Sequence, residues 1–175
     1  MTSAENLALK VLLRTTPGLP SGLAERLLAR LPYPYVGANV APLGVDLRRF
    51  LDQHRGQVDA AALLEQVQPP AEDSTTLALT MSDLFVSVMT YVFGLSELHG
   101  RRSVLSLARL ADEENPARFE ERLLIEATHE IGHSLGLVHC PVADCPMHRT
   151  LWPEQIDLKR PEYCPTCLAA LLEGG

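Results

Sequence analysis

Two histidines four residues apart, with a glutamate directly after the first, constrain this chain more than any other feature of its sequence. His129, Glu130 and His133 form the pattern H-E-x-x-H in a segment that is predicted to be helical. Residues four apart lie on one face of a helix, so the imidazoles of His129 and His133 can bind a single Zn²⁺. One helical turn therefore supplies two metal ligands and places a carboxylate beside them.

A third ligand follows from the residues after this helix. Gly136 permits a sharp reversal of the chain, so that His139 can return to the metal, whereas a straight helix would carry it away. Three neutral histidines leave the fourth position of a tetrahedral zinc open for water, which is typical of catalytic zinc. Glu130 is then the candidate general base, because a carboxylate beside that water can accept its proton and deliver it to the departing amine.

The alternative for these residues is a set of helix-surface histidines that bind nothing. In a chain of this composition, the full pattern including Gly136 and His139 is expected by chance roughly 4 times in 100,000. Coincidence is therefore a poor explanation, and we expect a catalytic metal site.

The cysteines form a second pattern near the C-terminus, C-x4-C followed by C-x2-C, made by Cys140, Cys145, Cys164 and Cys167. Two short-range thiolate pairs match a tetrahedral four-thiolate zinc, which contributes folding energy to a segment too short to bury its own core. The alternative is redox chemistry, since Cys164-Pro-Thr-Cys167 before an apolar helix resembles a dithiol motif. We favour a structural zinc because the other two cysteines lie within reach.

Length and composition limit the remaining possibilities. A chain of 175 residues with 46% hydrophobic and 21% charged residues suits one globular domain. The net charge of −7 argues against a nucleic-acid partner, and no run approaches the roughly 20 apolar residues of a membrane helix. Residues 7–13 are interrupted by Lys10 and lack a following cleavage site, so they indicate a strand rather than a secretory signal. We expect a cytoplasmic protein.

Apolar spacing, prolines and glycines predict an α/β order of elements. Asn115 and Pro116 are a typical cap and first residue for the long helix that carries the histidines. Beyond Gly136, frequent prolines predict little regular structure. The expected elements are strand 7–14, helix 23–31, strand 36–40, helix 59–67, strand 75–81, an antiparallel hairpin of 91–95 with 104–109, helix 116–135 and a short helix after 167.

The joined pattern H-E-x-x-H-x-x-G-x-x-H-C-x4-C-x-M, followed by C-x-x-C, resembles the archaemetzincins, a metzincin-type family of zinc metallopeptidases. The matched motif runs from His129 to Cys167, a little over a fifth of the chain. The resemblance implies Met147 as the Met-turn residue beneath the catalytic zinc; the alternative is an apolar side chain that fills a loop. It also implies two Zn²⁺ per chain, a catalytic one on His129, His133 and His139 and a structural one on the four cysteines.

The implied fold is α/β, a single compact metzincin-like domain over 1–175 with a mixed twisted sheet. The sheet is expected in 1–115, the active-site helix and third ligand in 116–139, and the Met-turn and an irregular, zinc-stapled segment in 140–175. Cys140 follows the third ligand and Cys145 precedes Met147 by two residues. We therefore expect the structural zinc to hold the loop of the catalytic one in place.

The expected function is hydrolysis of peptide bonds, and the expected partner is a peptide substrate bound by a monomer. The resemblance suggests short peptides and aminopeptidase-like cleavage, with the edge strand expected at 91–95 pairing with the substrate. The alternatives are a zinc-stabilised binding or scaffold protein with little turnover, and a thiol redox protein. Glu126 is taken as a solvated helix residue, and His54, His99 and His148 as surface histidines.

Overall fold

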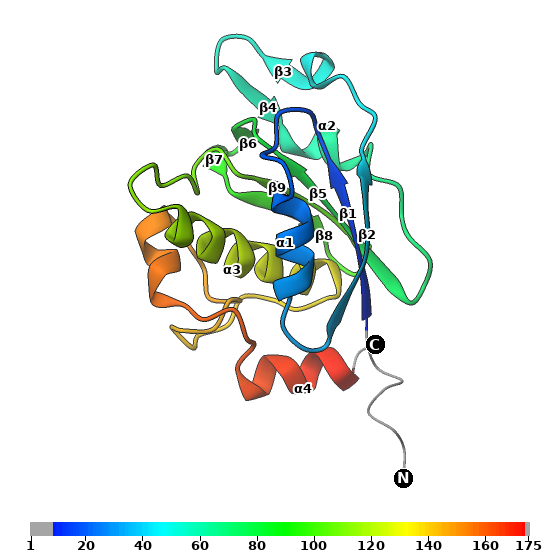
Figure 1. Ribbon diagram of the computed structural model, residues 1–175, viewed down its shortest axis with the longest axis vertical. Helices are drawn as coiled ribbons and strands as arrows, with labels where there is room; N and C mark the ends of the chain where they lie inside the picture. Colours follow the sequence, from blue (N-terminus) through cyan, green and yellow to red (C-terminus); the bar gives the residue numbers. More distant parts are fainter. Residues whose placement is uncertain (1–8, 174–175) are drawn as a thin grey trace.

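Five strands form the main sheet of the protein. In the computed structural model, which describes residues 9–173, four of them are parallel: β1 (Leu9–Thr15), β2 (Tyr35–Pro42), β5 (Ser74–Thr80) and β9 (Arg102–Ser106). The fifth strand, β8 (Gly94–Glu97), is antiparallel to β9 and forms one edge, so the strand order is β2-β1-β5-β9-β8 (Figure 1). This mixed sheet confirms the predicted α/β class.

Helices cover both faces of this sheet, which explains why β5 is buried at every position. Leu77 and Leu79 of β5 join one core cluster, to which two helices contribute, α1 (Leu23–Arg30) and α3 (Pro116–Ser134). Ala78 points to the opposite face and packs in a second cluster with the short helix α2 (Ala60–Leu64). The period of two along the strand thus divides the core into two layers.

A second, smaller sheet was not expected from the sequence. It contains β3 (Leu51–Asp52), β4 (Gln57–Asp59), β6 (Leu84–Val86) and β7 (Met89–Val92), in the order β3-β4-β6-β7, and a 3₁₀ helix, η2 (Leu47–Phe50), precedes β3. Strands of two to four residues are too short to show a regular alternation of apolar and polar side chains. These strands form because they pair with one another, and such pairing cannot be predicted from the local sequence.

The predicted hairpin exists, but its first strand lies further along the chain. Gly94 pairs with Leu105, and residues 91 and 92 belong to β7 of the small sheet instead. The second strand was placed too late, because β9 ends at Ser106, whose backbone N–H donates to the carbonyl of Phe93 at 2.7 Å. The expected edge strand is therefore β8.

The other early elements are close to the prediction. The first strand agrees with β1, and residues 7 and 8 lie outside the described part of the chain. The helix expected at 59–67 is shorter, since Asp59 caps it by accepting from the backbone N–H of Ala61 at 2.9 Å. After Leu64 the chain tightens, because the N–H of Val67 bonds the carbonyl three residues back.

The long helix α3 forms as predicted. The Asn115 side chain accepts from the backbone N–H of Arg118 at 3.1 Å, and Pro116 occupies the first turn. Gly136 ends the helix region with a φ of 101°, and the N–H of Leu137 returns to the carbonyl of Gly132 at 2.9 Å. Within residues 9–173, no helix is both long and apolar enough to cross a membrane.

The C-terminal segment runs beside α3 with little regular structure. Its two helical pieces are the 3₁₀ helix η3 (Pro153–Leu158) and α4 (Pro165–Glu173). The closing helix therefore begins two residues before Cys167 rather than after it, with a proline in its first turn. The irregular character that the prolines predicted is confirmed.

Replacing Gly132 with alanine would test how closely α3 packs on this segment. A Cβ at Gly132 would lie 2.5 Å from Sδ of Met147 and 2.9 Å from the hydroxyl of Tyr163. Helix propensity alone would make the change stabilising by about 1 kcal/mol, whereas overpacking costs about 1–3 kcal/mol. We expect a lower free energy of unfolding, measured by denaturant titration. A more stable variant would contradict the contact.

Candidate active site

The three predicted histidines converge on one point. His129 and His133 lie on α3, and His139 reaches them after the reversal at Gly136. Their ring centroids are 4.5 Å apart for 129 and 133, 5.5 Å for 129 and 139, and 4.9 Å for 133 and 139. One nitrogen from each ring lies within 4.8 Å of those of the other two. The three imidazoles therefore could hold one metal ion.

Two backbone carbonyls fix which nitrogen of each helical histidine carries the proton. Nδ1 of His129 lies 2.7 Å from the carbonyl of Pro146, and Nδ1 of His133 lies 2.7 Å from that of Leu137. A carbonyl can only accept, so each Nδ1 donates and each Nε2 presents a lone pair. The two Nε2 atoms are 3.0 Å apart. A cation between them would relieve this repulsion, and zinc at about 2.0–2.1 Å from each nitrogen suits the spacing.

Burial keeps these histidines in the neutral form that binds metal. It lowers the pKa of His129 well below its usual value, with the neighbouring His133 and the Lys159 ammonium acting in the same direction. Burial also lowers the pKa of His133 and of His139, although His139 is exposed on one side. Proton competition for the three nitrogens is therefore weak near neutral pH.

Glu130 is buried beside the histidines and is held by the edge strand. It is 5% exposed, and the hydroxyl of Ser96 on β8 donates to its Oε2 at 2.5 Å and contacts its backbone carbonyl at 2.8 Å. Burial raises the pKa of Glu130 to about 8, which the Ser96 hydrogen bond opposes. A metal cation held by the adjacent imidazoles would lower this pKa again and favour the carboxylate.

The lack of a side chain at Gly94 leaves room for the carboxylate of Glu130. A Cβ at Gly94 would lie 2.6 Å from Cδ of Glu130 and 2.6 Å from the carbonyl of Val104. Gly94→Ala should therefore displace the carboxylate and, on the expectation that Glu130 is the general base, lower kcat by about tenfold or more. The check is kcat on a cleaved peptide together with zinc per chain. Parent turnover in a zinc-loaded variant would contradict this prediction.

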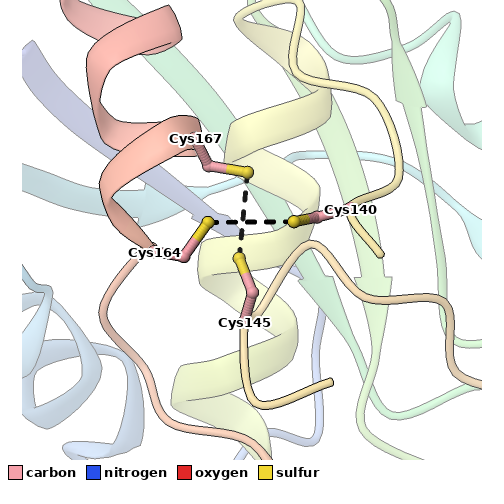
Figure 2. A group of neighbouring side chains, drawn as sticks. All are labelled: Cys140, Cys145, Cys164 and Cys167. Atoms are coloured by element: carbon pink, nitrogen blue, oxygen red, sulfur yellow. Dashed lines mark hydrogen bonds between the residues drawn. The ribbon is translucent and has the colours of Figure 1, made fainter. Parts of the chain in front are cut away.

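The four cysteines meet at one point, and Figure 2 shows their sulfurs turned toward a common centre. Sγ of Cys140 and Cys164 are 3.7 Å apart, and Sγ of Cys145 and Cys167 are 3.8 Å apart. Sulfurs about 2.3 Å from a central zinc lie about 3.8 Å from one another, whereas a disulfide is about 2.0 Å long. Burial raises the pKa of Cys145 and of Cys167, so a metal ion is needed to hold several thiolates together.

The cysteine cluster is joined to the histidine site through the loop between them. The backbone N–H of Cys140 donates to the carbonyl of Met147 at 2.9 Å, and the carbonyl of Cys140 lies 2.9 Å from Nδ1 of His148. Met147 is fully buried, with its sulfur against Gly132, one residue before His133. These contacts are compatible with the Met-turn position that the resemblance implies and with an apolar side chain that fills the loop, so the role of Met147 stays a prediction.

Three residues near the site were missed or misjudged from the sequence. Glu126 is 2% exposed rather than solvated, and its partner is Lys159, which is also buried. Its place three residues before His129 on the helix was the available signal. No sequence signal marked Ser96, because a serine in a strand has no evident role until the structure shows Glu130 beside it. His54 and His99 are exposed as expected, and His99 covers Gly136.

A cleft of about 700 Å³ opens over the histidines. It is lined by residues 89–96 of β7 and β8, by Glu130 and the three histidines, and by the segment Arg149–Leu151. Two of the lining residues are joined directly, because the hydroxyl of Tyr91 donates to the carbonyl of Leu151. The free edge of β8 thus runs along a cleft that also contains Glu130 and the three histidines.

Known proteins share both the sequence and this architecture. The model of peptidase family M54 matches residues 45–173. The archaemetzincin of Methanopyrus kandleri is 39% identical over 118 residues, 67% of each chain, and its crystal structure superposes with a TM-score of 0.84 over 99% of this chain and 98% of that one, at 28% identity. The archaemetzincin of Archaeoglobus fulgidus, solved with malonate, gives 0.80 over 92% and 99%, also at 28% identity. This chain therefore belongs to peptidase family M54, the archaemetzincins, and is a zinc metallopeptidase.

Proposed function

We propose that the chain hydrolyses peptide bonds at a zinc ion held by His129, His133 and His139, with Glu130 as the general base. The observation that carries the proposal is the pair of Nε2 lone pairs, 3.0 Å apart, whose Nδ1 partners are fixed by backbone carbonyls. When bound, zinc would polarise the substrate carbonyl and lower the pKa of the attacking water. The protein supplies the orientation of the ligands and the proton transfers.

Glu130 would move the proton that the reaction requires. Ser96 occupies its Oε2, which leaves Oε1 to accept a proton from the water whose oxygen bonds the carbonyl carbon. As the C–N bond breaks, the same oxygen delivers that proton to the amine nitrogen. No covalent intermediate with the protein is needed.

The substrate is proposed to bind as an added strand along β8. An extended peptide can pair with an exposed sheet edge, and β8 lines the cleft beside Glu130. Because Gly94 and Ser96 of this strand also hold Glu130, substrate pairing and the base share one element. We propose short peptides as substrates, with cleavage near the amino terminus.

Two zinc ions per chain are proposed, and metal analysis combined with a peptide-library digest tests the whole assignment. We expect about two zinc per chain, loss of cleavage with a chelator and recovery with Zn²⁺. Matched peptides with free and acetylated amino termini should differ, the acetylated ones being cut more slowly. Equal rates would refute the aminopeptidase-like preference alone.

An uncut library in the presence of both metals would favour the binding or scaffold alternative. A metal-free protein that is reversibly oxidised would favour the redox alternative. The monomeric state and the cytoplasmic location stay predictions.

A further inference from the structure

A buried lysine lies behind the histidine site and takes no part in the proposed reaction. The side chain of Lys159 is 1% exposed and follows directly after η3. Its ammonium donates to the carbonyl of Pro146 at 3.3 Å, to the carbonyl of His148 at 2.6 Å and to the hydroxyl of Thr150. One cation therefore bonds the chain on both sides of Met147.

The carbonyl of Pro146 connects this lysine to a proposed metal ligand. The same oxygen lies 3.3 Å from Nζ of Lys159 and 2.7 Å from Nδ1 of His129. Outer hydrogen-bond partners of this kind fix the tautomer and the ring orientation of a metal-binding histidine. The place of this oxygen thus decides where Nε2 of His129 points.

Both ends of this connection are anchored on α3. His129 is part of the helix, and Arg122 of the same helix bonds Asp157 of η3 through two contacts of 2.7 Å each. The side chain of Arg122 is 7% exposed and that of Asp157 is 29% exposed, so this ion pair is partly shielded from water. Lys159, two residues after Asp157, is consequently held at a defined distance from the helix.

Glu126 balances the buried charge. Its carboxylate is 2% exposed and lies 3.6 Å from Nζ of Lys159, and it also accepts from Thr150 at 3.4 Å. Replacing a buried ion pair with apolar side chains is often neutral or stabilising. Stability alone therefore does not account for a lysine and a glutamate at this position.

We propose that Lys159 is a positioning residue for His129. It holds the carbonyl of Pro146 where Nδ1 of His129 needs an acceptor, and so directs Nε2 toward the other two imidazoles. The inference rests on the proposed role of His129 as a metal ligand. Because Lys159 acts through Pro146 and does not touch the substrate, its loss should affect metal affinity and kcat more than KM.

Two variants that share the Glu126→Gln substitution measure the effect of the Lys159 ammonium alone. Glu126→Gln removes the countercharge of Lys159 but keeps its three acceptors on the loop and offers an amide oxygen in place of the carboxylate. Glu126→Gln/Lys159→Met removes the ammonium as well, so that no buried charge is left unpaired. Cobalt(II) titration reads the two metal sites separately, because thiolate-bound cobalt gives charge-transfer bands that imidazole-bound cobalt lacks. The cysteine site serves as the internal control.

We expect the double variant to bind Co²⁺ at the histidine site about 10- to 100-fold more weakly than Glu126→Gln does. The Kd of the cysteine site should stay within about twofold, and kcat should fall more than KM changes. Equal histidine-site Kd values in the two variants would overturn the proposal. Equal losses at both sites would also overturn it, because a purely structural role loosens the fold as a whole.

A second comparison applies if the double variant does not fold. Lys159→Arg in the Glu126→Gln background retains the cation but cannot place one nitrogen at the same point. Weaker binding at the histidine site alone would support the proposal, and an unchanged Kd there would overturn it. A parent protein that binds Co²⁺ only through thiolates would instead refute the proposed function, before any variant is compared.

Discussion

Replacing Glu130 with glutamine should lower kcat by about 10²- to 10⁴-fold, because the variant lacks the carboxylate that we propose accepts and returns the proton. In the parent protein, Ser96 donates to Oε2 of Glu130 at 2.5 Å. Glutamine has the same length, and its amide oxygen can still accept this hydrogen bond. Strand β8 and the three imidazoles should therefore stay in place. The measurement is kcat and KM on the best-cut library peptide, with zinc per chain determined in the same preparation.

Glu121→Gln is the matched control for this variant. It makes the same substitution on the same helix, but the Glu121 side chain is 45% exposed and pairs with Arg30 at the surface. Exposed ion pairs contribute about 1 kcal/mol or less to stability, so kcat should be unchanged. Equal cleavage by the parent and the Glu130 variant would mean that another group is the base or that a contaminant cuts the peptide.

The sequence predicted which three histidines lie together, because their signals are local. His129 and His133 depend only on the helical period, and His139 depends on the positive φ that Gly136 adopts at 101°. Asn115 likewise marks the start of α3 through a cap within three residues. Features of this kind depend on residues that are close together in the sequence, so they do not depend on how the rest of the chain folds.

The parts that escaped prediction depend on contacts between distant segments. Ser96 contacts Glu130 from 34 positions away, and Lys159 contacts Pro146 from the end of η3, which packs on α3. The small sheet similarly forms from short strands, and no local sequence pattern predicts how they pair. Tertiary pairing decides such positions, so a single sequence predicts the candidate ligands of the site better than the groups that hold them.

Replacing Cys164 with serine should both destabilise the fold and weaken zinc retention by the histidines. Cys164 faces Cys140 at 3.7 Å, and a serine hydroxyl is a poor substitute for one of four thiolates around the proposed structural zinc. Loss of a metal site is among the few single changes that cost more than about 4 kcal/mol. We therefore expect a marked fall in the free energy of unfolding, measured by denaturant titration in the presence of zinc.

The effect should reach the histidine site through the loop. Cys140 directly follows His139, and its N–H bonds the carbonyl of Met147, so a freed Cys140 loosens both the third ligand and the Met147 segment. Zinc per chain should fall below the single equivalent that loss of the cysteine site alone would leave. Thr166→Ser, an exposed change between Cys164 and Cys167, is the control and should keep both metals. Full zinc occupancy of the histidines in the Cys164 variant would show that the two sites are independent.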